Sequence, residues 1–240
     1  TVVFWVTHPA GATATFTRAP ARHYRSNVPH RCIKPRANYE YLAIPNYSDN
    51  FTIFSKSISG PALATSTWNY SYTHGMPLSF ENQCVQVGSA FCPVSRSATV
   101  TGPNQTWERH EFGILHGENE GQLLRTDTGS SPTNILRTEA NTYVTEAEAA
   151  SMPFPDQVGI NPLPFSETFA ESLRPIKLRL VSQQGQKFRT RTDAFDVFAR
   201  PVQVTRYSDL PLTYTSRSET ISYYDRLDKW VLGQVAQQVV

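Results

Sequence analysis

Residues 176–192 read IKLRLVSQQGQKFRTRT, and this stretch indicates how the chain folds. Ile176–Ser182 has the composition of a strand, and the chain then turns at Gln183–Gln186, where Gly185 favours a tight reversal. Lys187–Thr192 follows with apolar or hydroxyl side chains alternating with arginines. Two extended segments joined by a short turn are typical of an all-β protein.

The same pattern of short extended segments and turns continues outward in both directions. Further strands are predicted at spacings of about ten residues; they cover Val2–Thr7, Ala12–Arg18, Tyr39–Ile44, Phe51–Ile58, Ala64–Tyr72, Gln83–Cys92, Ala98–Gly102, Trp107–Leu115, Asp193–Ala199, Val202–Tyr207 and Leu212–Ser216. We therefore expect one domain over residues 1–240, a jelly-roll-like two-sheet β-sandwich with long loops and a C-terminal arm or projection. The proline-rich residues 150–168 are a possible internal boundary.

Two short helices are predicted within this β-rich chain. In Tyr143–Met152, Thr145 and Glu148 have the spacing of a capping box, and Pro153 ends the helix. Tyr223–Val235 has an amphipathic pattern that predicts a second helix.

Composition excludes several classes of protein. The chain has 240 residues and a formal net charge of +2, so it does not suit a strong electrostatic partner over its whole surface. It contains no run of about 18 apolar residues, which a membrane-spanning helix would need. Its cysteines, Cys32, Cys84 and Cys92, fit no zinc pattern; a Cys84–Cys92 bridge is possible, but free buried thiols are the preferred interpretation.

Basic residues are concentrated in two places. Residues 19–38 are predicted to form a long basic loop, and LRPIKLRL with KFRTRT forms the second basic stretch. Side chains here are candidates for contact with RNA or neighbouring subunits: Arg22, Arg25, Arg31, Lys34, Arg36, Arg189 and Arg191. The alternative is a solvated face whose arginines form salt bridges.

The stretch DTGSS (127–131) raises the possibility of an aspartic protease that uses Asp127. Such enzymes need two carboxylates that share a proton, and an apolar strand directly before each one. This chain has one such sequence, preceded by Arg125 and Thr126. Because Asp, Thr, Gly and Ser are frequent in turns, DTGSS is interpreted as a turn between Leu124 and Ile135.

No other catalytic, cofactor-binding or metal-binding pattern is found. His8, His23 and His30 have no metal-site spacing, and neither a GxSxG, a P-loop nor a GxGxxG sequence occurs. The sequence therefore predicts a protein that is not an enzyme and that has no cofactor, no metal site and no catalytic residue.

Two stretches carry a resemblance to a known family. YEYLAIPNYS (39–48) has an apolar strand followed by proline and an aromatic residue, and FDVFARP (195–201) has a strand that continues into a loop. Here the chain resembles the capsid proteins of picornavirus-like icosahedral RNA viruses. In that family the proline-aromatic stretch comes late in the domain, whereas here it comes early. An alternative therefore remains open, in which residues 1–100 end one jelly roll and residues 140–240 form a projecting domain.

The resemblance implies a structural subunit that assembles with copies of itself or sister capsid proteins around a single-stranded RNA genome. It further implies RNA on an inner face, a host receptor on an outer face, assembly in the host cytoplasm and location in the virion.

A second hypothesis is an extracellular β-sandwich that binds a carbohydrate or a receptor. It would use exposed aromatic side chains to stack on the ligand: Trp68, Tyr70, Tyr72 and Trp107. Sequons for N-glycosylation support it, and they begin at Asn46, Asn50, Asn69 and Asn104.

Overall fold

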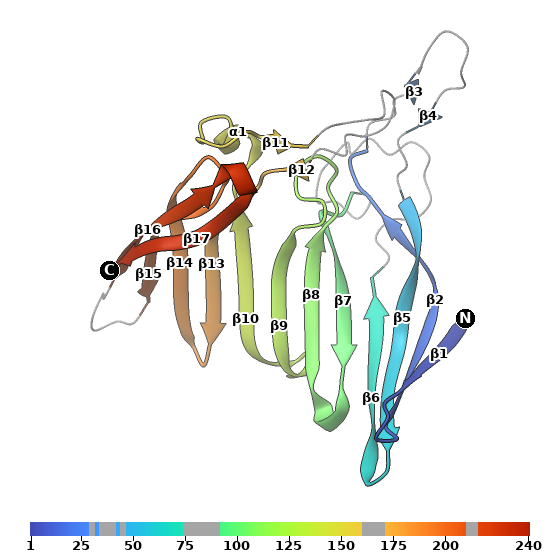
Figure 1. Cartoon of the computed structure of the whole chain (residues 1–240). Coiled ribbons are helices and arrows are strands. Elements are labelled where there is room, and N and C mark those ends of the chain that lie inside the picture. The colour runs from blue at the N-terminus through green and yellow to red at the C-terminus, as the bar shows by residue number, and fades with distance from the viewer. Residues whose placement is uncertain (29–31, 34–41, 44–46, 74–91, 160–170, 210–215) are drawn as a thin grey trace. The chain divides into compact units, whose positions relative to one another are not determined.

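The computed structural model describes residues 1–28, 32–33, 42–43, 47–73, 92–159, 171–209 and 216–240 (Figure 1). Strands account for most of these residues, which confirms the all-β prediction. The chain divides into two compact units, Thr1–Leu136 and Arg137–Val240, here called unit 1 and unit 2. No helix in the described ranges has the length and apolarity that crossing a bilayer would require.

Unit 1 is built on antiparallel strands that pair in chain order (Figure 1). The main strands are β1 (Val2–Thr7), β2 (Thr13–Tyr24), β5 (Tyr47–Gly60), β6 (Leu63–Tyr72), β7 (Ser95–Thr101), β8 (Trp107–Gly113) and β9 (Leu123–Ser131). The short strands β3 (Cys32–Ile33) and β4 (Leu42–Ala43) pair separately with each other. A 3-10 turn, η1 (Pro103–Gln105), connects β7 to β8.

β2 is longer than the sequence indicated. The segment Ala19–Tyr24 was expected to start the basic loop, but it continues β2 and pairs with β5 as far as Tyr24 opposite Tyr47. β1 pairs with β2 only up to Arg18, so Pro20 lies on a part of β2 that has one described neighbour. A proline is tolerated in a strand at such an edge position, since its missing N–H is not needed on the open side.

Backbone hydrogen bonds join the chain after β2 to the chain after β8. Ser26 forms a parallel bridge with Leu115, donating its backbone N–H to Ile114 at 2.8 Å and accepting one from His116 at 2.8 Å. The buried apolar side chains in the described part of unit 1 are Ala21, Val28, Cys92, Trp107, Ile114 and Leu115. The loop that leaves β2 is therefore fixed against the β8–β9 connection.

Unit 2 repeats the pattern of neighbouring antiparallel strands (Figure 1). Its main strands are β10 (Asn134–Tyr143), which begins before the unit boundary, β13 (Ile176–Gln183), β14 (Gln186–Phe195), β15 (Pro201–Ser208), β16 (Arg217–Arg226) and β17 (Val231–Val239). β11 (Gln157–Val158) pairs with β12 (Glu171–Ser172) as a separate ladder.

The hairpin predicted from residues 176–192 is present as β13 and β14. Gln183 lies opposite Gln186, and the two residues between them, Gln184 and Gly185, have φ values of 51° and 74°. Positive φ at both central positions is characteristic of the type I′ turn, whose twist matches that of the flanking strands. Gly185 adopts this conformation without steric cost, which explains why the turn is located here.

A small core in unit 2 forms beneath the predicted helix. The helix α1 covers Glu146–Ala149, and its capping box is formed because Thr145 and Glu148 bond each other's backbone N–H. Val144, Ala149, Phe154 and Phe195 make up the buried cluster, and the rings of Phe154 and Phe195 meet edge to face at 5.8 Å. The first predicted helix is therefore confirmed, over a shorter range.

The second predicted helix, Tyr223–Val235, is wrong. These residues belong to β16, the short 3-10 turn η2 (Leu227–Lys229) and β17, which pair from Thr220 opposite Val239 to Arg226 opposite Val231. Trp230 reverses the chain in the left-handed region at φ 51°, and two bulges shift the register. Those bulges disturb the two-residue alternation of a strand, and the resulting pattern of apolar residues has a false helical period.

Within each unit the main strands follow one another in chain order, as in a meander. A jelly roll instead requires Greek-key crossovers between two sheets, so the jelly-roll arrangement is not confirmed. The boundary predicted at 150–168 stays a prediction, and its residues 160–168 lie outside the described part. Also outside it are most of the strands predicted at Tyr39–Ile44, Gln83–Cys92 and Leu212–Ser216.

Candidate functional site

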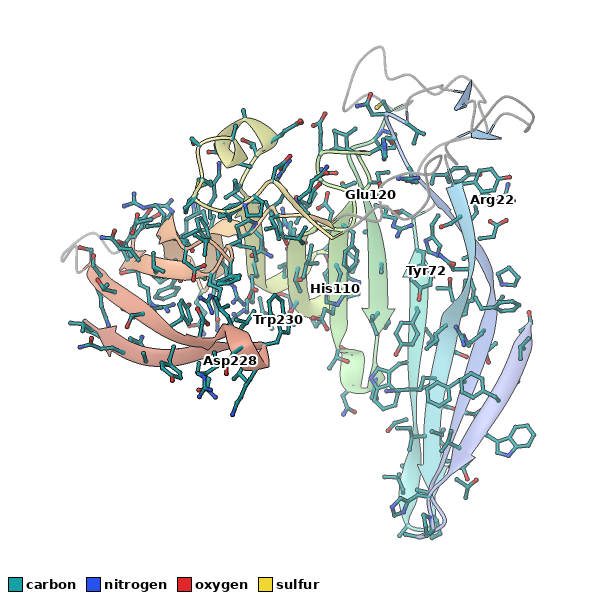
Figure 2. The ribbon with its side chains drawn as sticks, turned by 45° about the horizontal axis from the view of Figure 1, so that its top comes forward. Arg22, Tyr72, His110, Glu120, Asp228 and Trp230 are labelled. Carbon is teal, nitrogen blue, oxygen red and sulfur yellow. The ribbon has the colours of Figure 1, made fainter. Side chains whose placement is uncertain are left out.

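Arg22 is held by a carboxylate and an aromatic ring. From β2 its Nε and Nη2 each donate to an Asp49 carboxylate oxygen at 2.8 Å, and the guanidinium lies 4.1 Å from the Tyr47 ring centre. Figure 2 marks its place on the β2–β5 pair. The hydrogen bond lowers the pKa of the Asp49 carboxyl and raises the pKa of Arg22. A phosphate that approached the same edge of the Arg22 guanidinium would have to displace Asp49.

Arg25 belongs to a second cluster at the bridged end of unit 1. It forms an ion pair with Glu120 at 2.6 Å, and its Nη2 lies 2.8 Å from Nδ1 of His116. Burial opposes ionisation of the Glu120 carboxyl, but hydrogen bonds from His116 and Arg25 outweigh that effect and lower its pKa. Burial also lowers the pKa of Arg96. This cluster ties the end of β2 to the β8–β9 connection (Figure 2).

The basic residues predicted in unit 2 are paired as well. Both belong to β14; Arg189 contacts Asp209 at 2.5 Å, and Arg191 contacts Asp193 at 2.5 Å. Arg31, Lys34 and Arg36 lie outside the described residues. The described arginines thus match the salt-bridged alternative, and their contact with RNA or a neighbouring subunit stays a prediction.

Asp127 lies in the middle of β9, so the interpretation of DTGSS as a turn is wrong. Its side chain is 0% exposed and accepts hydrogen bonds from Arg109 at 2.6 Å and from Arg125 at 2.8 Å. Two guanidiniums stabilise the buried charge by short, charge-assisted bonds. The aspartate therefore stabilises the β8–β9 pair, and this geometry gives a protease substrate no access to it.

Position 129 requires a glycine because the backbone of Asn134 passes close to it, and not because of a positive φ. A Cβ added there would lie 2.1 Å from the backbone oxygen of Asn134, so a larger residue would push β9 from the start of β10. The chain reverses after β9, where Ser131 bonds the N–H of Asn134 at 3.1 Å. The turn therefore lies a few residues further along the chain than predicted.

A cluster around Arg200 was not predicted from the sequence. Its guanidinium donates to both Asp225 oxygens at 2.7 Å and to Asp196 at 2.7 Å, and it lies 4.2 Å from the Tyr223 ring centre. Asp196 also accepts the backbone N–H of Phe198 at 2.9 Å, which forms the turn that ends β14. The predicted strand Asp193–Ala199 is therefore wrong beyond Phe195. The sequence signal for the Arg200 cluster was the spacing of Asp196 and Arg200, but the segment that contains Asp196 was predicted to be a strand.

Two carboxyls in unit 2 make its stability depend on pH. The pKa of Glu148 falls from 4.5 to about 2, mainly because Lys177 bonds it, and the pKa of Asp225 falls from 3.8 to about 2, mainly because Arg200 bonds it. A carboxyl whose pKa is lower in the folded state stabilises the fold above its unfolded pKa and loses this effect as pH falls toward its folded pKa.

We therefore expect unit 2 to lose stability progressively between pH 4.5 and about 2. Thermal unfolding followed by circular dichroism across this range measures the effect. Glu148→Gln and Asp225→Asn should each flatten the pH dependence, because each removes one titrating group. Asp228→Asn is the milder control, because the Asp228 side chain is 61% exposed and its ion pair with the neighbouring Arg226 is screened by solvent. An unchanged slope in both test variants would contradict the assignment.

The aromatic residues of the binding-module hypothesis differ in their access to solvent. Trp107 is 6% exposed, so the expectation that it is an exposed stacking residue is wrong. Tyr72 bonds the backbone oxygen of Ile53 at 2.8 Å, and burial raises the pKa of Tyr72. Trp68 is partly exposed but lies under the Lys56 ammonium at 4.0 Å. Trp68 and Tyr70 remain available, and both are partly buried.

Cys92 is buried and disulfide-bonded, so the preferred interpretation as a free thiol is wrong for this residue. The other cysteines are Cys32 and Cys84, whose side chains lie outside the described part of the chain. Within that described part, no group of three His, Cys, Asp or Glu side chains is placed to hold a metal ion.

The surface that stands out is apolar and lies on outer strands. In β1, Val2, Val3, Phe4, Trp5 and Val6 are 37–69% exposed. In the β16–β17 hairpin, Trp230 is 74% exposed beside Leu227, and Figure 2 places Trp230 and Asp228 at its tip. Large apolar side chains that remain exposed on neighbouring residues mark interaction surfaces.

Comparison of the chain with protein-family models, with curated proteins and with solved structures finds no match.

Proposed function

We propose that this chain is a structural subunit of an icosahedral virus capsid. It would assemble with copies of itself or with sister capsid proteins around a single-stranded RNA genome. In this proposal the chain is part of a virion assembled in the host cytoplasm, with RNA on an inner face and a host receptor on an outer face. The two-sheet jelly-roll arrangement belongs to the same proposal, although the meander order of the described strands does not support it.

The observation that carries the proposal is the amount of exposed surface. The chain exposes 15725 Å². A compact protein of 27.0 kDa exposes about 10,800 Å², and two separate domains divided at residue 136 expose about 13,000 Å². An assembled subunit buries such surface against its neighbours.

Particle mass tests the proposal directly. We expect mass photometry of protein from its native source to show megadalton particles that contain the 27.0 kDa chain. Treatment with ribonuclease before and after particle disruption then shows whether RNA is enclosed. A species of 27.0 kDa alone, over a range of pH and salt, would contradict the capsid proposal.

The disulfide of Cys92 favours a second candidate, an extracellular β-sandwich that binds a carbohydrate or a receptor. Disulfides persist in oxidising compartments and are rare in the cytosol. The sequon asparagines Asn50, Asn69 and Asn104 are all exposed, whereas Asn46 lies outside the described residues. Glycans on these asparagines, together with a monomer that binds a glycan array, would support this candidate over the capsid.

A further inference from the structure

We propose that β1 pairs in an antiparallel arrangement with β1 of a second copy of this chain, so that the two strands join two sheets about a two-fold axis. The inference rests on the proposed assembly function, because it names one contact through which copies would assemble. It is argued from the exposure, the charge and the residue order of β1.

β1 is an edge strand with both faces accessible. It pairs with β2 from Val2 opposite Arg18 to Thr7 opposite Thr13, and no other strand in the described ranges pairs with it. Trp5 is 69% exposed and Val6 is 60% exposed, so side chains on opposite faces of the strand both lie in solvent. An open edge of this kind presents unpaired backbone groups to another strand.

The chemistry of β1 selects an uncharged, apolar partner. Proteins usually protect an open edge with a lysine, a proline or an inward-pointing charge. The strand VVFWVT has none of these residues. A charged strand that paired with it would place its charges among valines, phenylalanine and tryptophan, which costs desolvation energy. A second copy of β1 brings no charge at all.

The order of residues in β1 is nearly the same in both directions, which suits a two-fold axis. If the axis passes beside Phe4, then Val2 faces Val6 of the second copy, Val3 faces its Trp5, and Phe4 faces its Phe4. Every opposed pair is apolar, and aromatic or β-branched pairs are the ones that stabilise antiparallel strands. The ring of Phe4 already stacks on Phe16 of β2 at 4.9 Å, so the pairing would extend an aromatic row across four strands.

The outer strand of unit 2 is the alternative edge, and it suits self-pairing less well. β17 carries Gln234, Gln237 and Gln238 between its apolar residues, and Gln238 is bonded to Glu219 at 3.0 Å. Bulges in the β16–β17 pairing also interrupt its register. Val235 in β17 is 58% exposed and is therefore a matched position for a control substitution.

A single short strand buries less surface than a stable interface of about 1,000 Å² or more requires. We therefore expect a weak dimer, seen as concentration-dependent association in sedimentation velocity. Trp5→Lys should raise the dissociation constant by about tenfold or more, since each dimer contains two Val3–Trp5 pairs. Val235→Lys places the same charge on an exposed valine of β17 and should leave association unchanged.

Cysteine crosslinking tests the register itself. Phe4→Cys lies on the proposed axis, so two copies should form a disulfide-linked dimer on mild oxidation, because directly opposed Cβ atoms lie about 5 Å apart. Val6→Cys should not crosslink to itself, because it faces Val2 of the second copy, but Val6→Cys mixed with Val2→Cys should form the mixed dimer. The wild-type chain gives the background from its own cysteines.

The outcomes separate this contact from the proposed function. Failure of Phe4→Cys to crosslink, or a loss of association in Val235→Lys but not in Trp5→Lys, would overturn the β1 contact. If native particles still had megadalton mass, the capsid proposal would stand without it. Crosslinking at Phe4→Cys with no native particles would support the contact and count against the capsid.

Discussion

Asp127→Asn is expected to lower the free energy of unfolding of unit 1 by about 3 kcal/mol. The carboxylate is fully buried and accepts hydrogen bonds from Arg109 and Arg125, so the amide would remove the charge that both guanidiniums face. Urea denaturation followed by tryptophan fluorescence measures the loss, because Trp107 lies on the adjacent strand opposite Gly129.

Asp228→Asn is the matched control for this prediction. Asp228 also accepts two hydrogen bonds from an arginine, Arg226, but its side chain is 61% exposed. Exposed ion pairs contribute little, so the denaturation midpoint should not change measurably. Equal effects of the two substitutions would mean that burial of Asp127 does not determine its contribution. A double-mutant cycle with Arg109→Met would then measure the coupling of that pair.

Cys92→Ser is expected to destabilise unit 1 by about 2–5 kcal/mol, because it removes a disulfide from a buried position. A hydroxyl group left at this buried position adds a desolvation cost. Thermal unfolding with and without reducing agent measures the effect.

Comparing thermal unfolding with and without reducing agent distinguishes the effect of the disulfide from the effect of side-chain packing. Reduction should lower the melting temperature of the wild-type chain and leave that of Cys92→Ser unchanged. Cys92→Ala separates the hydroxyl from the lost bond, because alanine adds no polar group. A wild-type chain that melts at the same temperature in both conditions would contradict a stabilising disulfide at Cys92.

Strands with strong local signals could be predicted from the sequence. Val2–Thr7 was predicted with its bounds as observed, and the β13–β14 turn was located by Gly185. The helix start at Thr145 was identifiable because a capping box depends on residues three apart. These features depend on residues that are close together in the chain, and for this reason they could be predicted from the sequence.

Features that depend on contacts between residues far apart in the chain could not be predicted from the sequence. Residues 127–131 have turn-forming composition, yet they are a strand because Arg109 and Trp107 pair with them from β8. Tyr223–Val235 has a helical pattern because bulges in the β16–β17 pairing shift the alternation of its side chains. The basic residues could be listed from the sequence, but the acceptors of Arg22, Arg25 and Arg189 come from other segments.

The chain-order pairing of the strands also affects how the protein reaches its folded state. Each hairpin brings together residues that are close in sequence, so closing it costs little loop entropy and does not need the rest of the chain. Longer intervening segments are enclosed by β2–β5, β6–β7 and β10–β13. During synthesis each new strand can therefore add to the preceding one as it leaves the ribosome. Until the next strand of the same chain is synthesised, the edge strand of the growing sheet can pair with a strand of another nascent chain.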